Sequence, residues 1–274
     1  MSDRDGRSAP AGDPVPRVGV RATQKLQKVL ADAGLGSRRE MEALVRAGGV
    51  TVNGAPANIG ARVGPRDVIK VKGKTLRRPL QQRPPRVLLY HKPEGEIVSR
   101  GDPAGRPSVF ARLPPVRGAK WLAIGRLDFN TSGLLILTTS GELANRMMHP
   151  RYALEREYAV RVLGRLNTEE LGRLAAGISL EEGVARCDWI RDAGGEGANH
   201  WYRLVIREGR KRVVRRMFGA LGHAVSRLIR VRFGPISLPR QLRRGQFVEL
   251  ASRDIRTLLA SLDLPPQTAS KLTT

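Results

Sequence analysis

Residues 125–150, with the sequence GRLDFNTSGLLILTTSGELANRMMHP, decide the fold of this chain. The apolar run at 134–138 predicts a β-strand, and a second strand is predicted just before the stretch, at 121–124. Asp128 therefore stands in a turn between two apolar strands, among small polar residues. A carboxylate at the edge of a sheet can be oriented and partly desolvated, so this turn is the first candidate for a functional site.

The rest of residues 86–260 alternates between strand and helix patterns. Further strands are predicted at 87–90, 158–162, 184–190, 202–206, 226–231 and 247–250. Helices are predicted at 141–148 with Ser140 as cap, at 168–176 with Thr168 as cap, at 211–221, and at 253–261 with Ser252 as cap. Strands outnumber helices and several are joined by hairpins, which indicates an α+β domain on a mainly antiparallel or mixed sheet.

Residues 25–72 form a separate and smaller pattern. A first helical pattern ends at Gly34, and Ser37 with Glu40 has the form of a capping box that opens a second helix. Asn53-Gly54 is a tight-turn signal between short strands. These features predict a compact αβ module.

Three segments lack apolar periodicity. Residues 1–24 are rich in Ala, Gly, Pro and charge, which is typical of a disordered basic tail. Residues 73–85 are rich in proline and cations and are predicted to be a linker. Residues 261–274 contain Pro265 and Pro266 and then small polar residues, so we expect a second loose tail.

The charge balance points to a polyanionic partner. The chain has 49 Lys or Arg against 25 Asp or Glu, a net charge of +24. Self-repulsion of this size costs stability unless a polyanion neutralises it. Nucleic acid is the first candidate and an anionic membrane surface the second. Most of the cations are arginine, as in an Arg-rich proteome, but exchanging Lys for Arg leaves the net charge unchanged.

Composition excludes several classes of protein. Cys187 is the only cysteine, which rules out an internal disulfide and a Cys-based zinc site. The four histidines lack metal-ligand spacing. No apolar run approaches the roughly 20 residues of a membrane span, and the N-terminus has no apolar signal segment. We therefore expect a soluble cytoplasmic protein that uses neither a metal nor a cofactor.

Arg38 and Arg39 are the first candidate RNA contacts. They open the second predicted helix, where backbone amides already favour phosphate and two guanidinium groups strengthen the site. The alternative is two solvated arginines on an amphipathic helix. The stretch KVLADAGLGSRREMEALVRAGGVTVNG resembles the S4 RNA-binding domain, in which two helices and the following loop face structured RNA. The resemblance implies that residues 25–72 are an S4-like domain.

Residues 207–216, REGRKRVVRR, hold six cations and one acid. This density predicts a phosphate track in which Arg210, Lys211 and Arg212 contact RNA, although a solvated helix face explains part of it. Aromatic residues make up only 4% of the chain, so recognition of folded RNA by shape and phosphate fits better than stacking on several bases.

Asp128 also has an ordinary interpretation, because an aspartate in a turn often caps backbone amides. Arg126, two residues earlier, is a candidate RNA contact or a plain surface cation.

The stretch that contains Asp128 closely resembles the signature of bacterial ribosomal RNA pseudouridine synthases of the RsuA/RluB type. The segments HKPEGEIVSRGDPAGRPSVFARLP and EGRKRVVRRMFGALGHAVSRLIRVRFGPISL lie before and behind it in the family's order. The resemblance covers about residues 25–255, and HKPEGEIVSRGDPAGRPSVF is most similar to the large-subunit, RluB-like branch. It implies that residues 86–260 are a pseudouridine synthase catalytic domain.

The resemblance also implies roles for single residues. Asp128 matches the family's catalytic aspartate, and Tyr158 matches the aromatic residue that stacks on the target uracil. Arg215 matches the basic residue that pairs with the catalytic carboxylate and holds it ionised. Val213 departs from the family, which usually has Gln there, so a polar contact at this position is in doubt.

The chemistry of the implied reaction suits these residues. Pseudouridine forms when the N1–C1′ bond of uridine breaks, the base turns, and a bond to C5 replaces it, with no redox change and no cofactor. A carboxylate can attack C1′ as a nucleophile or remove a proton at C2′ to open a glycal route, and the sequence leaves both open. The target must leave its stack, which costs a few kcal/mol.

We therefore expect an enzyme that isomerises one uridine of ribosomal RNA, with 23S rRNA favoured over 16S rRNA. A non-catalytic RNA-binding or ribosome-assembly factor that kept the fold is the competing hypothesis. The expected partner is rRNA, alone or in an assembly intermediate, and charge repulsion favours a monomer.

Overall fold

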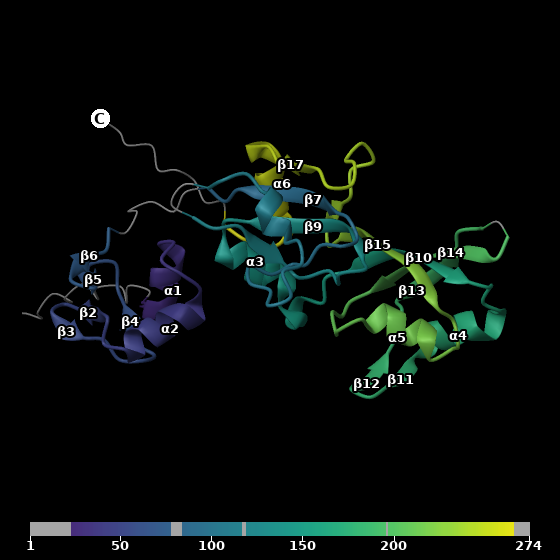
Figure 1. Cartoon of the computed structure of the whole chain (residues 1–274), viewed down its shortest axis with the longest axis horizontal. Helices are drawn as coiled ribbons and strands as arrows, with labels where there is room; N and C mark the ends of the chain where they lie inside the picture. The colour runs from purple at the N-terminus through teal and green to yellow at the C-terminus, as the bar shows by residue number, and fades with distance from the viewer. Residues whose placement is uncertain (1–22, 78–83, 117–118, 196, 266–274) are drawn as a thin grey trace, which may run out of the picture. The chain divides into compact units, whose positions relative to one another are not determined.

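The computed structural model describes residues 23–77, 84–116, 119–195 and 197–265. The chain divides into two compact units, Met1–Arg78 and Pro79–Thr274, each of which has its own core (Figure 1). Of the predicted tails and linker, residues 1–22, 78–83 and 266–274 lie outside the described residues.

The first unit packs two helices on short strands. Its elements are β1 (Gln24–Lys25), α1 (Leu26–Asp32), α2 (Arg38–Arg46), β2 (Val50–Val52), β3 (Ala55–Pro56), β4 (Arg62–Val63), β5 (Ile69–Val71) and β6 (Lys74–Thr75). The predicted capping box is present: the Ser37 hydroxyl accepts from the Glu40 amide at 3.2 Å, and the Glu40 carboxylate accepts from the Ser37 amide at 2.5 Å. Asn53 and Gly54 have φ of 52° and 87°, as their tight turn requires.

The second unit is built on a nine-stranded mixed sheet with the order β13-β14-β10-β15-β9-β7-β17, with β16 and β8 paired to β15 and β9. Its strands are β7 (Val87–Lys92), β8 (Leu122–Ile124), β9 (Ser132–Thr138), β10 (Arg156–Leu163), β13 (Trp189–Asp192), β14 (Asn199–Ile206), β15 (Val225–Phe233), β16 (Ile236–Ser237) and β17 (Phe247–Glu249). Among the strands described, only β9 and β15 run parallel to each other, so the predicted α+β fold on a mainly antiparallel sheet is confirmed.

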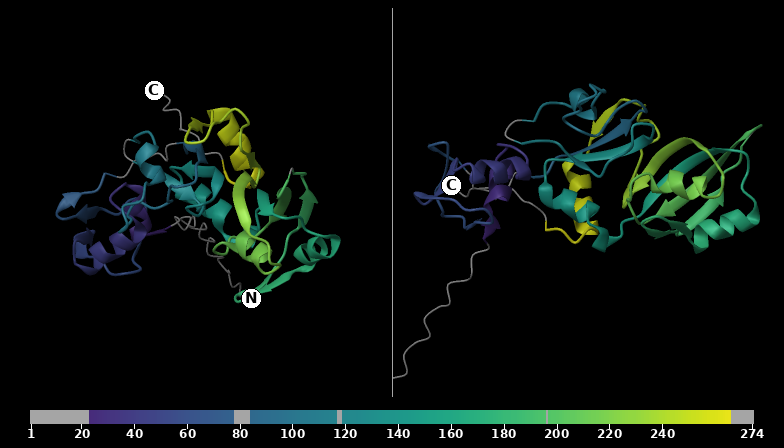
Figure 2. Two further views of the ribbon diagram at one scale, coloured as in Figure 1. Left: turned by 45° about the vertical axis from the view of Figure 1, so that its right-hand side comes forward. Right: turned by 60° about the horizontal axis from the view of Figure 1, so that its bottom comes forward.

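Helices and loops cover the sheet in three places (Figure 2). Helices α4 (Thr168–Ala176) and α5 (Val213–Gly219) pack on β10, β14 and β15. Helices α3 (Gly141–Met148) and α6 (Ser252–Ser261) pack on one face of β7 and β9. The other face of β7 and β9 is covered by residues between 98 and 127, including the 3-10 turn η1 (Val109–Arg112).

Helix α3 has the predicted bounds, and the Ser140 hydroxyl accepts from the Leu143 amide at 3.2 Å as predicted. Two predicted caps are wrong by one residue. Asn167 caps α4 in a capping box with Glu170, because the chain enters the helix one residue before Thr168. Ser252 is itself helical, and Ala251 holds the cap position of α6.

Two predicted elements have other bounds. The helix at 211–221 begins only at Val213, because Arg212 has a left-handed φ of 52° that cannot continue a helix. The strand at 184–190 is instead β12 (Gly183–Ala185), which pairs with β11 (Ile178–Leu180), followed by β13. Between them the Cys187 amide donates to the Leu174 carbonyl at 2.8 Å, which takes the chain out of the ladder.

The part of the chain that the structure describes contains no helix that is both long and apolar enough to span a bilayer.

Candidate functional site

Residues 125–131, the Asp128 loop, connect β8 to β9. Leu127 points into the core and is buried, while Asp128 is half-buried. The Asp128 carbonyl accepts from the Thr131 amide at 3.1 Å, which closes a tight turn. The loop thus anchors on an apolar side chain and presents the neighbouring carboxylate at the edge of the sheet.

Gly133 fixes the exit of this loop. It lies opposite Arg230 in the short parallel ladder between β9 and β15, with φ of 109°. A Cβ atom at Gly133 would stand 2.3 Å from the Arg230 carbonyl oxygen and 2.6 Å from its amide nitrogen. Only glycine allows this approach of the two backbones.

Lys92, the last residue of β7, contacts the Asp128 loop through its side chain. Its side chain is fully buried, and Nζ donates to the carbonyls of Pro93 at 2.8 Å and Thr131 at 2.9 Å. A longer contact of 3.5 Å joins Nζ to the Phe129 carbonyl, which also accepts from the Gly95 amide at 2.9 Å. One ammonium group therefore ties the residues that follow Asp128 to the end of β7.

The Lys92 ammonium is also an electrostatic element of the site. Burial lowers its pKa to about 8, against the opposing charges of Glu96, Asp128 and Glu94. It lies close enough to Asp128 for the two charges to interact.

Arginines at the start of α5 also hold the Asp128 loop. Arg212 Nη1 donates to Asn130 Oδ1 at 3.1 Å, and Arg215 Nη2 donates to the Asn130 carbonyl at 2.7 Å. Arg215 Nη1 donates to the Val225 carbonyl at 2.6 Å. Burial, and then the charge of Arg212, lower the pKa of Arg215, while Asp128 raises it.

The resemblance to the synthases implied that Arg215 pairs with Asp128. Within the described residues, no side chain forms a hydrogen bond or ion pair with the Asp128 carboxylate, and Arg215 acts on it through space. The carboxylate is consequently free to meet a substrate, with Lys92 and Arg215 as its cationic neighbours.

Tyr158 lies on β10, opposite Arg230 of β15, and only 9% of it is exposed. The Arg230 guanidinium is fully buried beside the Tyr158 hydroxyl, and its Nε donates to the Leu134 carbonyl at 2.9 Å. Two strand spacings separate Tyr158 from Gly133, about 10 Å. Arg230 therefore bridges the tyrosine and the strand that carries the Asp128 loop.

The other predicted RNA contacts fall into two groups. Arg126, Lys211 and Arg212 are exposed near the loop or at the start of α5, and Arg38 and Arg39 are exposed on α2 of the first unit. Arg210 has an internal role: its guanidinium pairs with Glu208 and donates to the carbonyls of residues 182–184 in the β11–β12 hairpin. Val213 is buried in the core and presents no polar group.

Sequence reasoning missed Lys92, Asn130 and Arg230. Lys92 had a signal, since a lysine at the end of an apolar strand must find polar partners when it is buried. Arg230 had no signal in the sequence that separates it from Arg227 and Arg232 on the same strand, which are exposed and half-buried.

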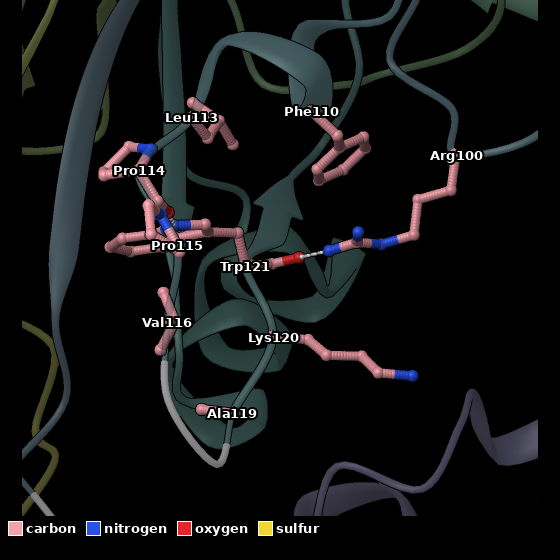
Figure 3. Close-up of a pocket in the computed structure, with 9 residues that line it drawn as sticks. All are labelled: Arg100, Phe110, Leu113, Pro114, Pro115, Val116, Ala119, Lys120 and Trp121. Carbon is pink, nitrogen blue, oxygen red and sulfur yellow. Dashed lines mark hydrogen bonds between the residues drawn. The ribbon is translucent and has the colours of Figure 1, made fainter.

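A cavity of about 180 Å³ is lined by residues outside this loop (Figure 3). Its lining residues are Arg100, Phe110, Leu113, Pro114, Pro115, Val116, Ala119, Lys120 and Trp121. Arg100 Nη2 donates to the Trp121 carbonyl at 2.9 Å, and the Arg100 guanidinium lies 4.3 Å from the centre of the Phe110 ring. The cavity shares no residue with the Asp128 loop. Within the described residues, no group of three His, Cys, Asp or Glu side chains could hold a metal ion.

Comparison with known proteins gives consistent matches. Residues 86–220 match the family model of RNA pseudouridylate synthases, and residues 24–69 match that of the S4 domain. The chain is 51% identical over 253 residues to the ribosomal large subunit pseudouridine synthase B of Escherichia coli (strain K12). The aligned region covers 91% of this chain and 87% of that protein.

A protein of the same name from Yersinia pestis is 50% identical over 252 residues, covering 91% of this chain and 79% of its own length. The crystal structure of a pseudouridylate synthase has a TM-score of 0.59 at 26% identity, and the match covers 85% of this chain and 99% of that one.

Proposed function

The chain belongs to the RNA pseudouridylate synthases, and on that premise we propose that Asp128 is the catalytic carboxylate that converts one uridine of large-subunit rRNA to pseudouridine. The predicted family and enzyme class are confirmed by the relatives, which are named as synthases acting on the large ribosomal subunit. One observation carries the proposal for Asp128: Lys92 and Arg215 hold the residues that follow it, while its carboxylate has no protein partner among the described residues.

The ties give the loop a fixed geometry before RNA arrives. Lys92 holds the carbonyl of Thr131, and Arg212 and Arg215 hold Asn130. A group that is positioned in advance need not be ordered during the reaction, which lowers the barrier. The cations of Lys92 and Arg215 compensate the Asp128 charge without occupying its oxygens.

The isomerisation needs no redox change and brings in no external group. The N1–C1′ bond breaks, the uracil turns, C5 bonds to C1′, and C5 then loses its proton while N1 gains one. Asp128 either attacks C1′ or takes the C2′ proton, and both routes require it to reach the ribose.

Tyr158 is proposed to contact the turned uracil. Arg230 beside its hydroxyl keeps the ring in one place, and its low exposure leaves only part of the ring for that contact. Stacking of a base on an aromatic ring is worth about 1–3 kcal/mol.

We assign RNA docking to residues 25–72 and catalysis to residues 86–260. The exposed Arg38 and Arg39 at the start of α2 support the first role, since helix N-termini and guanidinium groups both bind phosphate. Arg126, Lys211 and Arg212 are the proposed RNA contacts near the loop. The net charge of +24 opposes self-association, so we propose that the enzyme acts as a monomer.

Release of tritium from rRNA labelled at C5 of uridine tests the proposal, because isomerisation must lose that hydrogen. We expect release by the wild type, none by Asp128→Asn, and wild-type release by Asp254→Asn, which changes an exposed carboxylate on α6. Separate large-subunit and small-subunit substrates, naked and as particles, distinguish 23S from 16S rRNA. RNA binding without release from any of them would instead support a non-catalytic assembly factor.

A further inference from the structure

Strands β13, β14, β10 and β15 differ sharply between their two faces. Helices α4 and α5 lie together on one side of them (Figure 1), over a core that includes Tyr158, Val160 and Tyr202. Side chains alternate along a strand, so the residues between these point to the opposite face. That face carries Arg161, Arg191, Arg203 and Arg227, here called the arginine face. All four side chains are exposed or half-buried.

The arginines stand opposite one another in the ladder. Arg161 of β10 is directly opposite Arg227 of β15, and Arg191 of β13 is directly opposite Arg203 of β14. Like charges in this position destabilise a sheet. The two pairs are offset by two residues, with Arg161 opposite Trp201 and Arg203 opposite Ala159 in the β10–β14 ladder. Local conflicts of this kind are expected at functional or strained sites.

Few acids relieve this conflict. Glu157 forms an ion pair with Arg203 at 2.5 Å. Arg161 Nε donates to the Ser226 hydroxyl at 3.0 Å. Among the described residues, no carboxylate pairs with Arg161, Arg191 or Arg227. An external anion placed between two facing guanidinium groups would turn the repulsion into attraction.

Tryptophan accompanies the arginines. Two of the chain's three tryptophans, Trp189 and Trp201, lie on this face and are half-buried. The Arg191 guanidinium lies 5.2 Å from the Trp189 ring, and that of Arg161 lies 5.8 Å from the Trp201 ring. Partly exposed Trp and Arg side chains dominate binding surfaces in general, and indole rings also stack on bases.

We propose that the arginine face is a second RNA-binding surface, which grips the sugar–phosphate backbone of rRNA away from the target uridine. The proposal rests on the proposed function in that its ligand is RNA. A guanidinium group binds phosphate through two parallel hydrogen bonds, and two of them facing across a ladder can share one phosphate. An acidic protein segment offers carboxylates but no bases for the two indoles.

The location of the face predicts which RNA it binds. Tyr158 and the arginines lie on opposite sides of the same sheet. A short hairpin around the target uridine cannot occupy both sides, whereas a large folded rRNA can. The arginine face therefore adds affinity for long rRNA and none for a minimal substrate.

The test compares Arg161→Ala/Arg227→Ala with Arg253→Ala/Arg256→Ala, which removes two exposed arginines of α6 that have no acidic partner among the described residues. Binding of a long 23S rRNA fragment and of a short target hairpin is measured from low to high salt. Each phosphate contact contributes about 0.9 to the slope of log K against log salt concentration. For the long RNA, the magnitude of this slope should therefore be about 2 smaller for Arg161→Ala/Arg227→Ala than for the wild type. Its affinity there should fall about tenfold, with no change on the hairpin and none in the control variant.

A second pair of measurements excludes a folding defect. Removing facing like charges should leave the melting temperature equal to or above that of the wild type, and Arg161→Lys/Arg227→Lys should retain the wild-type slope. Equal slopes for the Arg161→Ala/Arg227→Ala variant and the α6 control on long RNA would overturn the proposal. So would loss of binding to an acidic peptide with no loss of binding to RNA. Tritium release from the short hairpin is recorded in parallel, so a failure of the proposed function is visible separately from the salt slopes.

Discussion

The Asp128 loop and the arginine face treat their cations in opposite ways. Around the loop, Lys92 and Arg215 each donate to two carbonyl oxygens of the protein itself. On the arginine face, Arg161 stands opposite Arg227 in the ladder, and its guanidinium contacts only the Ser226 hydroxyl and the Trp201 ring among the described residues. The two regions lie on the same sheet and share the same residue types.

This difference suggests two roles for cations: those around the loop position the backbone, and those on the arginine face bind a ligand. A cation that is satisfied internally holds backbone in place and has little left for a ligand. A cation left among like charges costs stability until a ligand arrives. Substitutions in the two regions should therefore differ in their effects on stability and on RNA binding, and the largest effect is expected at the Asp128 loop.

Gly133→Ala should have the largest effect, because its Cβ would overlap the Arg230 backbone at a φ of 109°. We expect a loss of about 3 kcal/mol or more in the free energy of unfolding, or no soluble protein. Gly172→Ala, in α4 with open space around it, should instead stabilise by about 0.5–1 kcal/mol. Urea denaturation measures the free energy of unfolding of the two variants and the wild type. Near-wild-type stability of Gly133→Ala would contradict the close approach of β9 and β15.

Lys92→Met should change how stability depends on pH. The pKa of Lys92 falls from 10.5 to about 8 on folding, so between these values the unfolded chain holds more protons than the folded one. Stability of the wild type should therefore rise from about pH 8 to about pH 10.5, by about 3 kcal/mol. The variant should show no such rise in the same urea titrations.

Tritium release should follow the opposite trend in the wild type. Above pH 8 the neutral amine has one donor fewer for the carbonyls of the Asp128 loop. We expect the rate to fall through that range while stability increases. A rate that tracks stability would argue that Lys92 does not position the loop.

Arg210→Ala and Lys211→Ala, neighbours in the chain, should separate the two behaviours. Arg210 is tied to Glu208 and the β11–β12 hairpin, so its loss should cost about 1–2 kcal/mol of stability with an unchanged salt slope of RNA binding. Lys211 is exposed and has no protein partner among the described residues. Its loss should leave stability unchanged and lower the slope by about 1. The reverse pattern would remove Lys211 from the RNA contacts.

The smallest effect is expected for the Arg191–Arg203 pair. A double-mutant cycle with Arg191→Ala and Arg203→Ala should give an unfavourable coupling energy of about 0.2–0.5 kcal/mol at low salt. Both single variants can be compared by thermal unfolding with and without 1 M salt, which should remove the coupling. A favourable coupling would show that an unrecognised anion of the protein holds the pair together.

Features that depend on residues close together in the chain could be predicted from the sequence. The α3 helix and the Ser37–Glu40 capping box each depend on a few residues close together in the chain, and both have the predicted positions. Asn167 and Thr168 are both good caps, and the choice between them depends on the direction of the preceding loop, which no local pattern contains.

Contacts between distant strands were harder to predict. Lys92 and Arg230 acquire their roles only because β7, β9 and β15 meet, and the spacing of residues along one strand does not reveal this. The pairing of Arg215 with Asp128 was implied by resemblance alone. The structure gives Arg215 two carbonyl partners that depend on how α5 is seated against the Asp128 loop.

The parallel ladder of β9 and β15 also has a consequence for synthesis. Ser132 pairs with Ile229, so the strand that carries the Asp128 loop gains this neighbour only after most of the chain has been made. Contacts between residues so far apart in the chain form late, because a long loop must close first. A nascent chain that has not reached residue 230 has Asp128 but no finished site around it. The surroundings of Asp128 are therefore complete only after the residues of β15 have been made.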